Sequence, residues 1–368
     1  MRCTQPDWKG SNELTRIFLI RHAEAEGNIF RRAHGHFNGQ VIGRGHAQIG
    51  QLKERFKNET IDAVYSSDLS RTMTTASAIC DAHGLSINAT ERLREIKVGE
   101  WEDVAWGDII FRYPEMSGFF GSDPARWTVD GSEDYMLVRE RMKNCVTEIG
   151  RRHEGGSVAV FSHGFAIRAF LCELKGIPSH KTELVPYCDN TAVALLNYSN
   201  DDLSVVYHGD NSHLSGENST FATQTWWRDQ KERKNEDIRY SKVDANRDAA
   251  LLELCGNKLC ANSPDGILFI ALLGNEPIGI LELDTGKEHG DGVGWISLLF
   301  VMPEFRRVEY EVQLLGQAVS EFRKLRRYRL RATVVSDEQL LAFSTRFGFT
   351  KISESDSLCT MEKNIRNW

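Results

Sequence analysis

Two histidines and two arginines each follow an apolar, strand-like segment of the sequence. They are Arg21, His22, Arg71 and His163. A neutral imidazole is a good nucleophile near pH 7, and the planar guanidinium of arginine fits two phosphate oxygens at once. Attack of a histidine on phosphorus would form a phosphohistidine and divide hydrolysis into two smaller barriers. Together the four residues predict a pocket for a dianionic phosphate.

A fifth residue, Glu95, has the chemistry that phosphate transfer still requires. The leaving oxygen needs a proton, and a carboxylic acid with a raised pKa supplies one. Glu95 lies in the string Leu-Arg-Glu-Ile-Lys-Val-Gly-Glu-Trp, 93–101, whose apolar residues would favour its protonated form. Gly164, next to His163, opens a helix whose free N–H groups would suit an anion. Taken singly, each residue is a weak signal, because a strand-end histidine is more often a satisfied structural group and an arginine or a glutamate is often a surface charge.

Alternating strands and helices are predicted to bring these residues together. Apolar strands at 15–20, 61–65 and 157–161 alternate with helical patterns at 47–56, 69–83 and 135–152. A helix at 165–175 and strands at 192–197 and 203–207 complete the pattern. Such alternation is typical of a mainly parallel α/β sheet, in which ligands bind at the carboxyl ends of the strands. The candidate residues follow those ends.

Residues 15–207 resemble the histidine phosphatase superfamily, which has the phosphoglycerate mutase-like fold. The family's Arg-His-Gly-Glu-x-x-x-Asn signature matches Arg21, His22, Glu24 and Asn28. Its second arginine matches Arg71 in Ser-Ser-Asp-Leu-Ser-Arg, its acid matches Glu95, and its second histidine matches His163 in Ser-His-Gly. These matches follow one another in the family's order.

The resemblance implies a role for each of these residues. His22 would be the phosphorylated nucleophile, and Glu95 would be the general acid and then the base for the attacking water. Arg21, Asn28, Arg71 and His163 would bind the phosphoryl group, together with Gly164. The implied fold is a three-layer α/β sandwich. The implied activity is a phosphomonoesterase that acts on a small organic phosphate, without a metal or another cofactor.

Three features of the sequence depart from the family's pattern. Ala23 stands where the signature has glycine, which adds a methyl group beside the nucleophile. Ala25 stands where a threonine usually follows the glutamate, and the loop 38–45 is a few residues shorter than usual. We expect these changes to reduce or narrow the activity without abolishing it, because every residue with a chemical role is present.

The same region distinguishes a phosphatase from a mutase. The string around Glu95 resembles that of the broad phosphatases, and a mutase must also keep water away from its phosphoenzyme. We therefore favour a phosphatase, with a phosphoglycerate mutase-type phosphotransferase as an alternative. The aromatic-rich insertion 104–130 is predicted to be either a substrate lid or helices that pack on the core. As a lid, it would favour a small substrate with an apolar or flat portion.

A second unit is predicted beyond a Gly/Asn/Ser-rich stretch at 208–225, which we interpret as a linker between domains at 13–207 and 226–368. The charged and aromatic segment 226–240 is predicted to be a helix or a solvated connector. Further helices are predicted at 245–256, 311–325 and 337–347, and strands at 267–273, 277–283, 294–301, 328–334, 349–353 and 358–363. The basic cluster 323–331 is explained by a helix C-terminus followed by an exposed strand face.

Residues 226–368 resemble the GNAT-type N-acetyltransferase superfamily, a smaller α+β fold, through a strand, Pro-Glu-Phe-Arg and an apolar helix. That family binds the pyrophosphate of acetyl-CoA in an Arg-x-x-Gly-x-Gly/Ala loop. Arg306 matches its arginine, but Glu309 and Glu311 replace the two small residues. A carboxylate about 5 Å from a phosphate charge would cost roughly 3 kcal/mol at an effective dielectric constant of about 20. Ser344 stands where a tyrosine often protonates the departing thiolate.

Two hypotheses follow for this second unit. It is either a degenerate acetyltransferase fold, kept for packing, dimerisation or ligand sensing, or half of a bifunctional phosphatase and N-acetyltransferase. In the second case Val301, Arg306, Arg307 and Val312 would bind acetyl-CoA. A third possibility is a non-catalytic protein in which both folds bind ligands.

Length and composition agree with this two-domain organisation. The 368 residues exceed what one core usually supports, and 41% of them are hydrophobic, so both units can bury a core. The 45 Lys+Arg against 52 Asp+Glu give a net charge of −7, which argues against a nucleic-acid partner. No export signal or membrane span is visible, and the eight dispersed cysteines fit a reduced, cytoplasmic protein. A homodimer is possible.

Overall fold

The first part of the chain forms a six-stranded sheet in the order β3-β2-β4-β1-β5-β6. The computed structural model describes residues 14–223, 237–256, 266–308 and 310–367. Strands β1 (Thr15–Arg21), β2 (Ala63–Ser66), β3 (Ile87–Ala89) and β4 (Ser157–Ser162) are parallel to one another. Strands β5 (Val193–Ser199) and β6 (Asp202–Asp210) complete the sheet in antiparallel pairing. The predicted mainly parallel α/β sheet is therefore present.

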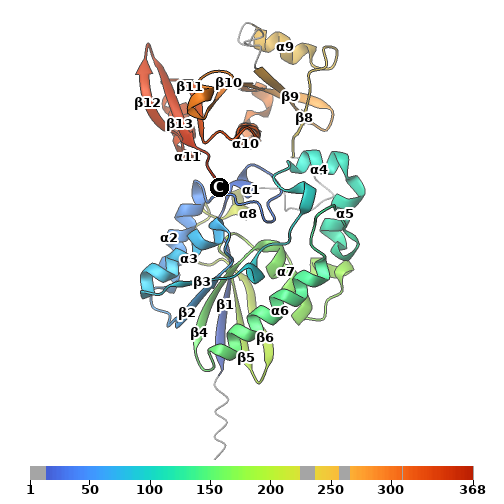
Figure 1. Ribbon diagram of the computed structural model, residues 1–368, viewed down its shortest axis with the longest axis vertical. Helices are drawn as coiled ribbons and strands as arrows, with labels where there is room; N and C mark the ends of the chain where they lie inside the picture. The colour runs from blue at the N-terminus through green and yellow to red at the C-terminus, as the bar shows by residue number, and fades with distance from the viewer. Residues whose placement is uncertain (1–13, 224–236, 257–265, 309, 368) are drawn as a thin grey trace, which may run out of the picture.

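Alternating side chains of β1 enter two separate cores, because successive residues of a strand point to opposite faces of the sheet. Phe18 and Ile20 pack with residues of α2 (Arg44–Phe56) and α3 (Ser70–His83). Ile17 and Leu19 pack with residues of α6 (Tyr135–Arg152) and α7 (Gly164–Leu174). The helices thus cover both faces of the sheet and make the predicted three-layer sandwich (Figure 1).

Short helices lie in the connections of this first part. They are α1 (Glu26–Ile29), α4 (Trp106–Arg112), α5 (Pro114–Ser122) and α8 (Thr220–Thr223). The stretch 208–225, predicted as a linker, begins within β6 and contains α8. The backbone N–H of Thr220 donates to Asp189 Oδ1 at 2.9 Å, so the stretch is folded onto the first sheet domain at this point.

The second part forms a seven-stranded sheet in the order β12-β13-β11-β10-β9-β8-β7. Its strands are β7 (Arg239–Ser241), β8 (Gly266–Leu273), β9 (Glu276–Asp284), β10 (Val293–Val301), β11 (Arg329–Val335), β12 (Thr350–Ser355) and β13 (Leu358–Asn364). Its helices are α9 (Ala249–Cys255), α10 (Tyr310–Lys324) and α11 (Glu338–Arg346). Helix α10 connects β10 to its parallel neighbour β11.

One secondary-structure prediction for this part is wrong. The segment 226–240 was predicted to be a helix or a solvated connector. Its residues 226–236 lie outside the described residues, but Arg239–Ser241 form strand β7. This strand pairs with β8, and Ile238 and Tyr240 are buried. Burial of these alternating side chains against α10 and the sheet outweighs the helical charge pattern of the segment.

The two sheets lie with α10 between them (Figure 1). The carboxyl ends of the parallel strands in the first sheet face the second domain, and α10 lies close to α1 (Figure 1). Among the described residues, no helix is long and apolar enough to cross a membrane.

Candidate active site

His22 extends from the carboxyl end of β1 into a cavity of about 590 Å³. Its Nδ1 lies 2.7 Å from the carbonyl oxygen of Ala23, which can only accept a hydrogen bond. The proton of the neutral ring is therefore on Nδ1, and Nε2 has a free lone pair. Burial and the positive charges of Arg71 and Arg21 lower the pKa of His22 well below 6.5. The geometry gives a neutral imidazole that is suited to nucleophilic attack.

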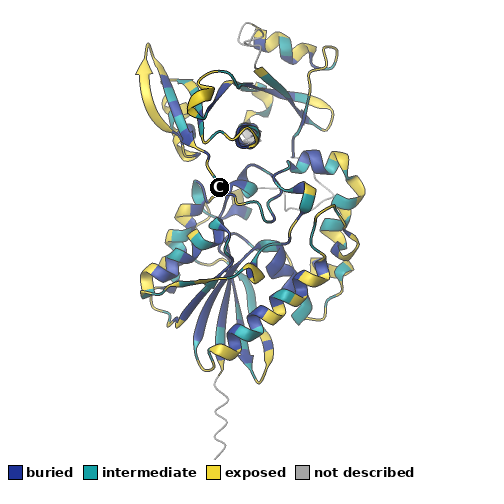
Figure 2. Cartoon of the chain, in the orientation of Figure 1, coloured by how far each residue is buried: buried dark blue, intermediate teal, exposed yellow. Residues whose placement is uncertain are grey.

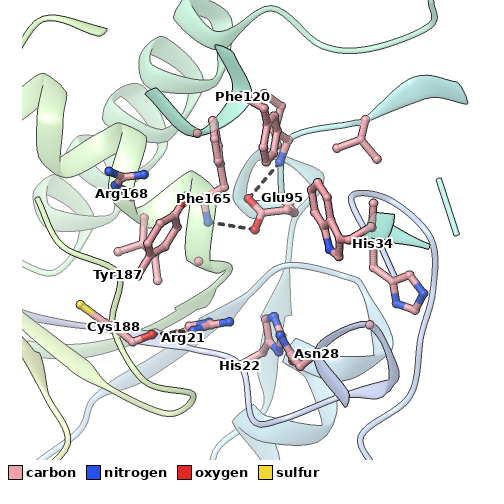
Figure 3. Close-up of a pocket in the computed structure, with 18 of the residues that line it drawn as sticks. Arg21, His22, Asn28, His34, Glu95, Phe120, Phe165, Arg168, Tyr187 and Cys188 are labelled. Carbon is pink, nitrogen blue, oxygen red and sulfur yellow. Dashed lines mark hydrogen bonds between the residues drawn. The ribbon is translucent and has the colours of Figure 1, made fainter. Parts of the chain in front are cut away.

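Arg21 lines the same cavity and is held from one side only. One terminal nitrogen donates to the carbonyl oxygen of Cys188 (Figure 3), and the buried Nε has no hydrogen-bond partner among the described residues. Burial lowers the pKa of Arg21, and the charge of Asp189 partly opposes that change. A Cβ atom at Gly164 would lie 3.1 Å from Arg21 Nε, so a glycine leaves room for this guanidinium. Arg21 therefore has hydrogen-bonding capacity for an anion.

Arg71 and His163 lie near His22 but are bonded mainly to the protein. Arg71 Nε donates to His163 Nδ1 at 3.2 Å, and its terminal nitrogens donate to the carbonyl oxygens of Gly35 and Phe37, both at 2.8 Å. His163 is fully buried, and its Nε2 lies 2.9 Å from Ser67 Oγ. The rings of His22 and His163 are 5.2 Å apart. Both residues are thus held by protein groups, and Arg71 also lines the cavity, so their role in binding phosphate stays a prediction.

Glu95 lies in the cavity wall beside the first turn of α7. Its carboxylate accepts hydrogen bonds from the backbone N–H groups of Phe165 at 3.0 Å (Figure 3), Ala166 at 2.7 Å and Ile96 at 3.1 Å. Burial raises its pKa, and these three hydrogen bonds oppose the rise. The N–H groups of Phe165 and Ala166 thus position the candidate acid, and Gly164, which also lines the cavity, stays a predicted phosphate-binding residue.

Asn28 lines the cavity from α1. Its Oδ1 accepts from the backbone N–H of Ala25 at 3.1 Å, which leaves its amide N–H groups for a ligand. A residue that the sequence reasoning missed, Asn190, donates to the carbonyl oxygen of His22 at 2.9 Å and to Asn28 Oδ1 at 3.4 Å. Its only signal was a polar Asp-Asn-Thr string before the buried strand β5. Asn190 joins the nucleophile loop to α1.

The two alanines that depart from the family's pattern are both buried in the protein. Ala23 is fully buried, and its N–H donates to Thr75 Oγ1 at 2.9 Å. Ala25 is also buried. Between them, Glu24 forms two hydrogen bonds of 3.0 Å with Arg44. The backbone after the nucleophile is therefore held on both sides.

The loop that covers Arg71 is fixed by Glu102, another residue that the sequence reasoning missed. The Glu102 carboxylate accepts from the backbone N–H groups of Gly35 at 3.1 Å, His36 at 2.7 Å and Phe37 at 2.7 Å. The same segment leads into the short loop 38–45. A carboxylate that binds three successive N–H groups holds the loop carbonyls against Arg71.

The aromatic insertion 104–130 forms both a cavity wall and part of the core. Helices α4 and α5 contribute Trp106 and Phe120 to the cavity. Phe120 stacks on Phe165 with ring centroids 4.8 Å apart, and Trp127 is buried in the core. Trp127 thus fits the interpretation of the insertion as helices that pack on the core, whereas the substrate lid stays a prediction. Phe120 and Phe165 lie on the side of the cavity opposite Arg21 and His22 (Figure 3).

The second predicted site does not have the shape of an anion cradle. Val301 and Val312 are buried in the apolar core under α10, and the Nε of Arg306 donates back to the carbonyl oxygen of Val301 at 2.9 Å. The side chain of Arg307 and residue 309 lie outside the described residues. Glu311 lies in the first turn of α10, where a pyrophosphate would have to bind. These residues do not fit acetyl-CoA.

The predicted acid position of that site is also closed. Ser344 is buried, and its hydroxyl donates to the carbonyl oxygen of Leu340 at 2.8 Å. The hydroxyl is therefore engaged within α11.

Comparison with known proteins agrees with the geometry of the first site. The family model of the histidine phosphatase superfamily (branch 1) matches residues 17–211, and that of the acetyltransferase (GNAT) family matches residues 223–349. The first match spans more than half of the chain, so this protein belongs to the histidine phosphatase superfamily, with a GNAT-type domain joined to it.

Individual relatives cover the first domain. Phosphoserine phosphatase 1 of Hydrogenobacter thermophilus is 30% identical over 50% of this chain and 87% of its own length. Phosphoglycerate mutase-like protein 4 of Arabidopsis thaliana is 31% identical over 54% of this chain and 86% of its own length. The structure of Bacillus stearothermophilus YhfR, 27% identical, covers 55% of this chain and all of that chain, with a TM-score of 0.53. The predicted fold, phosphatase class and fusion are confirmed.

Proposed function

We propose that this protein hydrolyses a small organic phosphate monoester through a phosphohistidine on His22. The observation that supports it best is the orientation of His22, because the hydrogen bond of Nδ1 to the Ala23 carbonyl directs the lone pair of Nε2 toward the cavity. Arg21, Asn28 and Glu95 line that same cavity. A nucleophile, two phosphate-binding groups and an acid are thus together in one site.

In the first half-reaction, Nε2 of His22 forms a bond to phosphorus while the phosphorus–oxygen bond of the ester breaks. The leaving oxygen takes the proton of Glu95, whose raised pKa favours the protonated form that this step requires. Arg21 and Asn28 bind the phosphoryl oxygens. The positive charge that the imidazole gains is offset by the negative charge of the phosphoryl group.

In the second half-reaction, water attacks phosphorus and the bond to His22 breaks. Glu95, now a carboxylate, takes a proton from that water, so the acid of the first step becomes the base of the second. Inorganic phosphate leaves, and both His22 and Glu95 return to their starting states. The proposed reaction needs no metal or other cofactor, and its substrate would be a small phosphate ester and not a nucleic acid.

Phosphoserine is the first substrate to test, because the Hydrogenobacter relative is named a phosphoserine phosphatase. The experiment measures phosphate release from phosphoserine, p-nitrophenyl phosphate and a panel of sugar phosphates by the purified full-length chain. We expect turnover of at least one ester by the wild type and none by His22→Ala. Acid-labile phosphate should be trapped on the wild type and absent from the variant. Equal rates for the two proteins would refute the proposal.

A phosphoglycerate mutase-type reaction is the alternative that the Arabidopsis relative favours. ³¹P spectroscopy of 3-phosphoglycerate with the enzyme separates the two reactions. A phosphatase produces inorganic phosphate, whereas a mutase produces 2-phosphoglycerate and retains the phosphoryl group. We expect inorganic phosphate.

We propose that the GNAT-type domain does not bind acetyl-CoA, since Glu311 lies in the first turn of α10 and the Nε of Arg306 donates to the carbonyl oxygen of Val301. Calorimetric titration of the full-length chain with acetyl-CoA should show no binding at micromolar concentrations. Micromolar binding would instead support the bifunctional enzyme.

Location and assembly complete the proposal. Among the described residues, Cys80, Cys145, Cys172, Cys188 and Cys359 are free thiols, which supports the proposed cytoplasmic location. The homodimer stays a prediction.

A further inference from the structure

Helix α10 of the GNAT-type domain is buried on two sides. Of its 15 residues, twelve are buried (Figure 2). Leu314 and Ala318 belong to the apolar core of the second sheet, whereas Gly316 faces the first domain. A Cβ atom at Gly316 would lie 2.4 Å from the Cβ of Phe30, directly after α1. The helix therefore packs against the segment that follows the nucleophile.

One contact across this interface is a buried ion pair between Arg323 and Glu26. The terminal nitrogens of Arg323 lie 2.9 and 3.0 Å from the two carboxylate oxygens of Glu26. The side chains are 6% and 1% exposed, so water hardly reaches the pair. Glu26 begins α1, which also contains Asn28. A bidentate ion pair fixes both the position and the rotation of α1.

A second buried network lies one turn earlier on α10. Ser320 Oγ donates to Asp103 Oδ2 at 2.6 Å and accepts from a terminal nitrogen of Arg32 at 2.8 Å. The Nε of Arg32 donates to Asp103 Oδ1 at 2.9 Å, and its other terminal nitrogen donates to Gln317 at 2.8 Å. His34, which lines the cavity, lies 3.1 Å from Asp103 Oδ1. The network therefore reaches the start of the loop that covers Arg71.

The second part of the chain also contributes directly to the cavity. Asp237, just before β7, lines the cavity together with Arg31. The two oxygens of Asp237 accept from Arg31 at 2.6 and 2.9 Å. Residues 26–34, which supply α1 and part of the cavity wall, are thus held by the second domain at three separate points.

We infer that the GNAT-type domain is part of the phosphatase site, and that Arg323 is a positioning residue that holds α1 and Asn28 for phosphate binding. This inference rests on the proposed function of the first domain. In this role the GNAT-type domain needs no cofactor, because α10 packs against residues 26–34, which follow the nucleophile, and holds them in place. Arg323 acts through Glu26 and does not touch the substrate.

The test compares Arg323→Gln with Arg331→Gln in the full-length protein. Arg331 also pairs with carboxylates, Glu362 and Glu288, but both partners lie in the second domain. We measure kcat and KM with p-nitrophenyl phosphate, and the affinity for inorganic phosphate by calorimetry. Because small displacements in an active site are costly, we expect Arg323→Gln to lose about tenfold in kcat/KM and to bind phosphate more weakly. Arg331→Gln should keep wild-type values.

A mutant cycle tests whether Arg323 acts through Glu26. In the Glu26→Gln background, Arg323→Gln should change kcat/KM little further, because the contact is already lost. A stabilising role alone would lower the melting temperature of Arg323→Gln while kcat, KM and phosphate affinity stay at wild-type values. That result would overturn the inference, as would equal kinetic losses in both backgrounds.

Two further measurements keep the outcome clear. If Arg323→Gln does not fold, Arg323→Lys replaces it in the test, since an ammonium keeps the charge but cannot make the bidentate contact. Wild-type kinetics in Arg323→Lys would then overturn the inference. If the wild type turns over no ester, the proposed function fails by itself. Phosphate affinity still decides the positioning role, because it does not depend on turnover.

Discussion

The Nε of Arg71 donates a hydrogen bond to Nδ1 of His163 across 3.2 Å, and this contact determines the tautomer of the His163 ring. Since Nδ1 accepts, the proton of the neutral His163 ring is on Nε2, which faces Ser67 Oγ. Burial and the charge of Arg71 lower the pKa of His163 well below 6.5, which agrees with a neutral ring. The pair forms a fixed support beside His22.

The first prediction concerns the geometry of Arg71. In Arg71→Lys the charge remains, but one ammonium cannot bond His163, Gly35 and Phe37 in their present directions. We expect kcat/KM to fall by about 100-fold, since both the loop and His163 lose their support. Steady-state kinetics with p-nitrophenyl phosphate measure this, and Arg92→Lys, which alters a surface ion pair with Glu148, is the control. Unchanged kinetics in Arg71→Lys would mean that the activity depends on the charge of this side chain and not on its hydrogen-bonding geometry.

The second prediction is an activity that is greatest at acid pH. His22 must be neutral to attack, and its lowered pKa keeps it neutral as the pH falls below 6.5. Glu95 must be protonated in the first step, and its raised pKa keeps the proton above pH 4.5 but loses it as the pH rises further. The profile of kcat/KM should therefore be bell-shaped, with its maximum below neutral pH.

The variant Glu95→Gln tests the assignment of the alkaline limb. Glutamine cannot donate a proton to the leaving oxygen, so the variant should be slow and its remaining activity should lose the fall on the alkaline side. The ionisation of the substrate phosphate, near pH 6, affects wild type and variant alike and so cancels in the comparison. An unchanged alkaline limb would assign that ionisation to another group.

The third prediction concerns Arg168, which lines the cavity and is 7% exposed. Its Nε donates to the carbonyl oxygen of Val185 at 2.8 Å, and its guanidinium lies over the ring of Tyr187 at 4.3 Å. It forms no ion pair with a carboxylate among the described residues. We therefore expect it to favour substrates with a second anionic group, because a buried guanidinium gains most from a carboxylate.

The comparison of two substrates isolates that effect. Arg168→Gln should lower kcat/KM for phosphoserine, which has a carboxylate, about tenfold more than for p-nitrophenyl phosphate, since a charge-assisted hydrogen bond contributes roughly 1.5 kcal/mol. An equal loss for both substrates would show that Arg168 only supports the cavity wall.

Arg21, His22, Arg71 and His163 could be proposed from the sequence because each follows an apolar run that is visible as a strand. Asn28 and Glu95 follow no such run and were proposed from the family motif and from the string 93–101. Their partners were not, since Asn190 and Glu102 meet the site through backbone groups far away in the chain. The interface was missed for a related reason. Ser320 and Arg323 have the small and charged side chains of a solvent-facing helix surface, and the sequence places Arg323 in the basic cluster 323–331, which a helix C-terminus and an exposed strand face explain. Only the fold reveals Glu26 opposite it.

The fourth prediction uses two glycines inside helices to test the interface by stability. Gly50 in α2 has open space where a Cβ would be, so Gly50→Ala should stabilise the protein by about 0.5–1 kcal/mol through helix propensity. Gly316→Ala has the same propensity gain, but its Cβ would lie 2.4 Å from Phe30 and force the domains apart. We expect a net loss of about 1–2 kcal/mol, in the range of overpacked cores. Thermal and urea unfolding measure both variants. Equal stabilisation by the two alanines would mean that α10 does not pack tightly against Phe30 in solution. In that case α10 would not support α1, and the positioning role inferred for Arg323 would lose its structural basis.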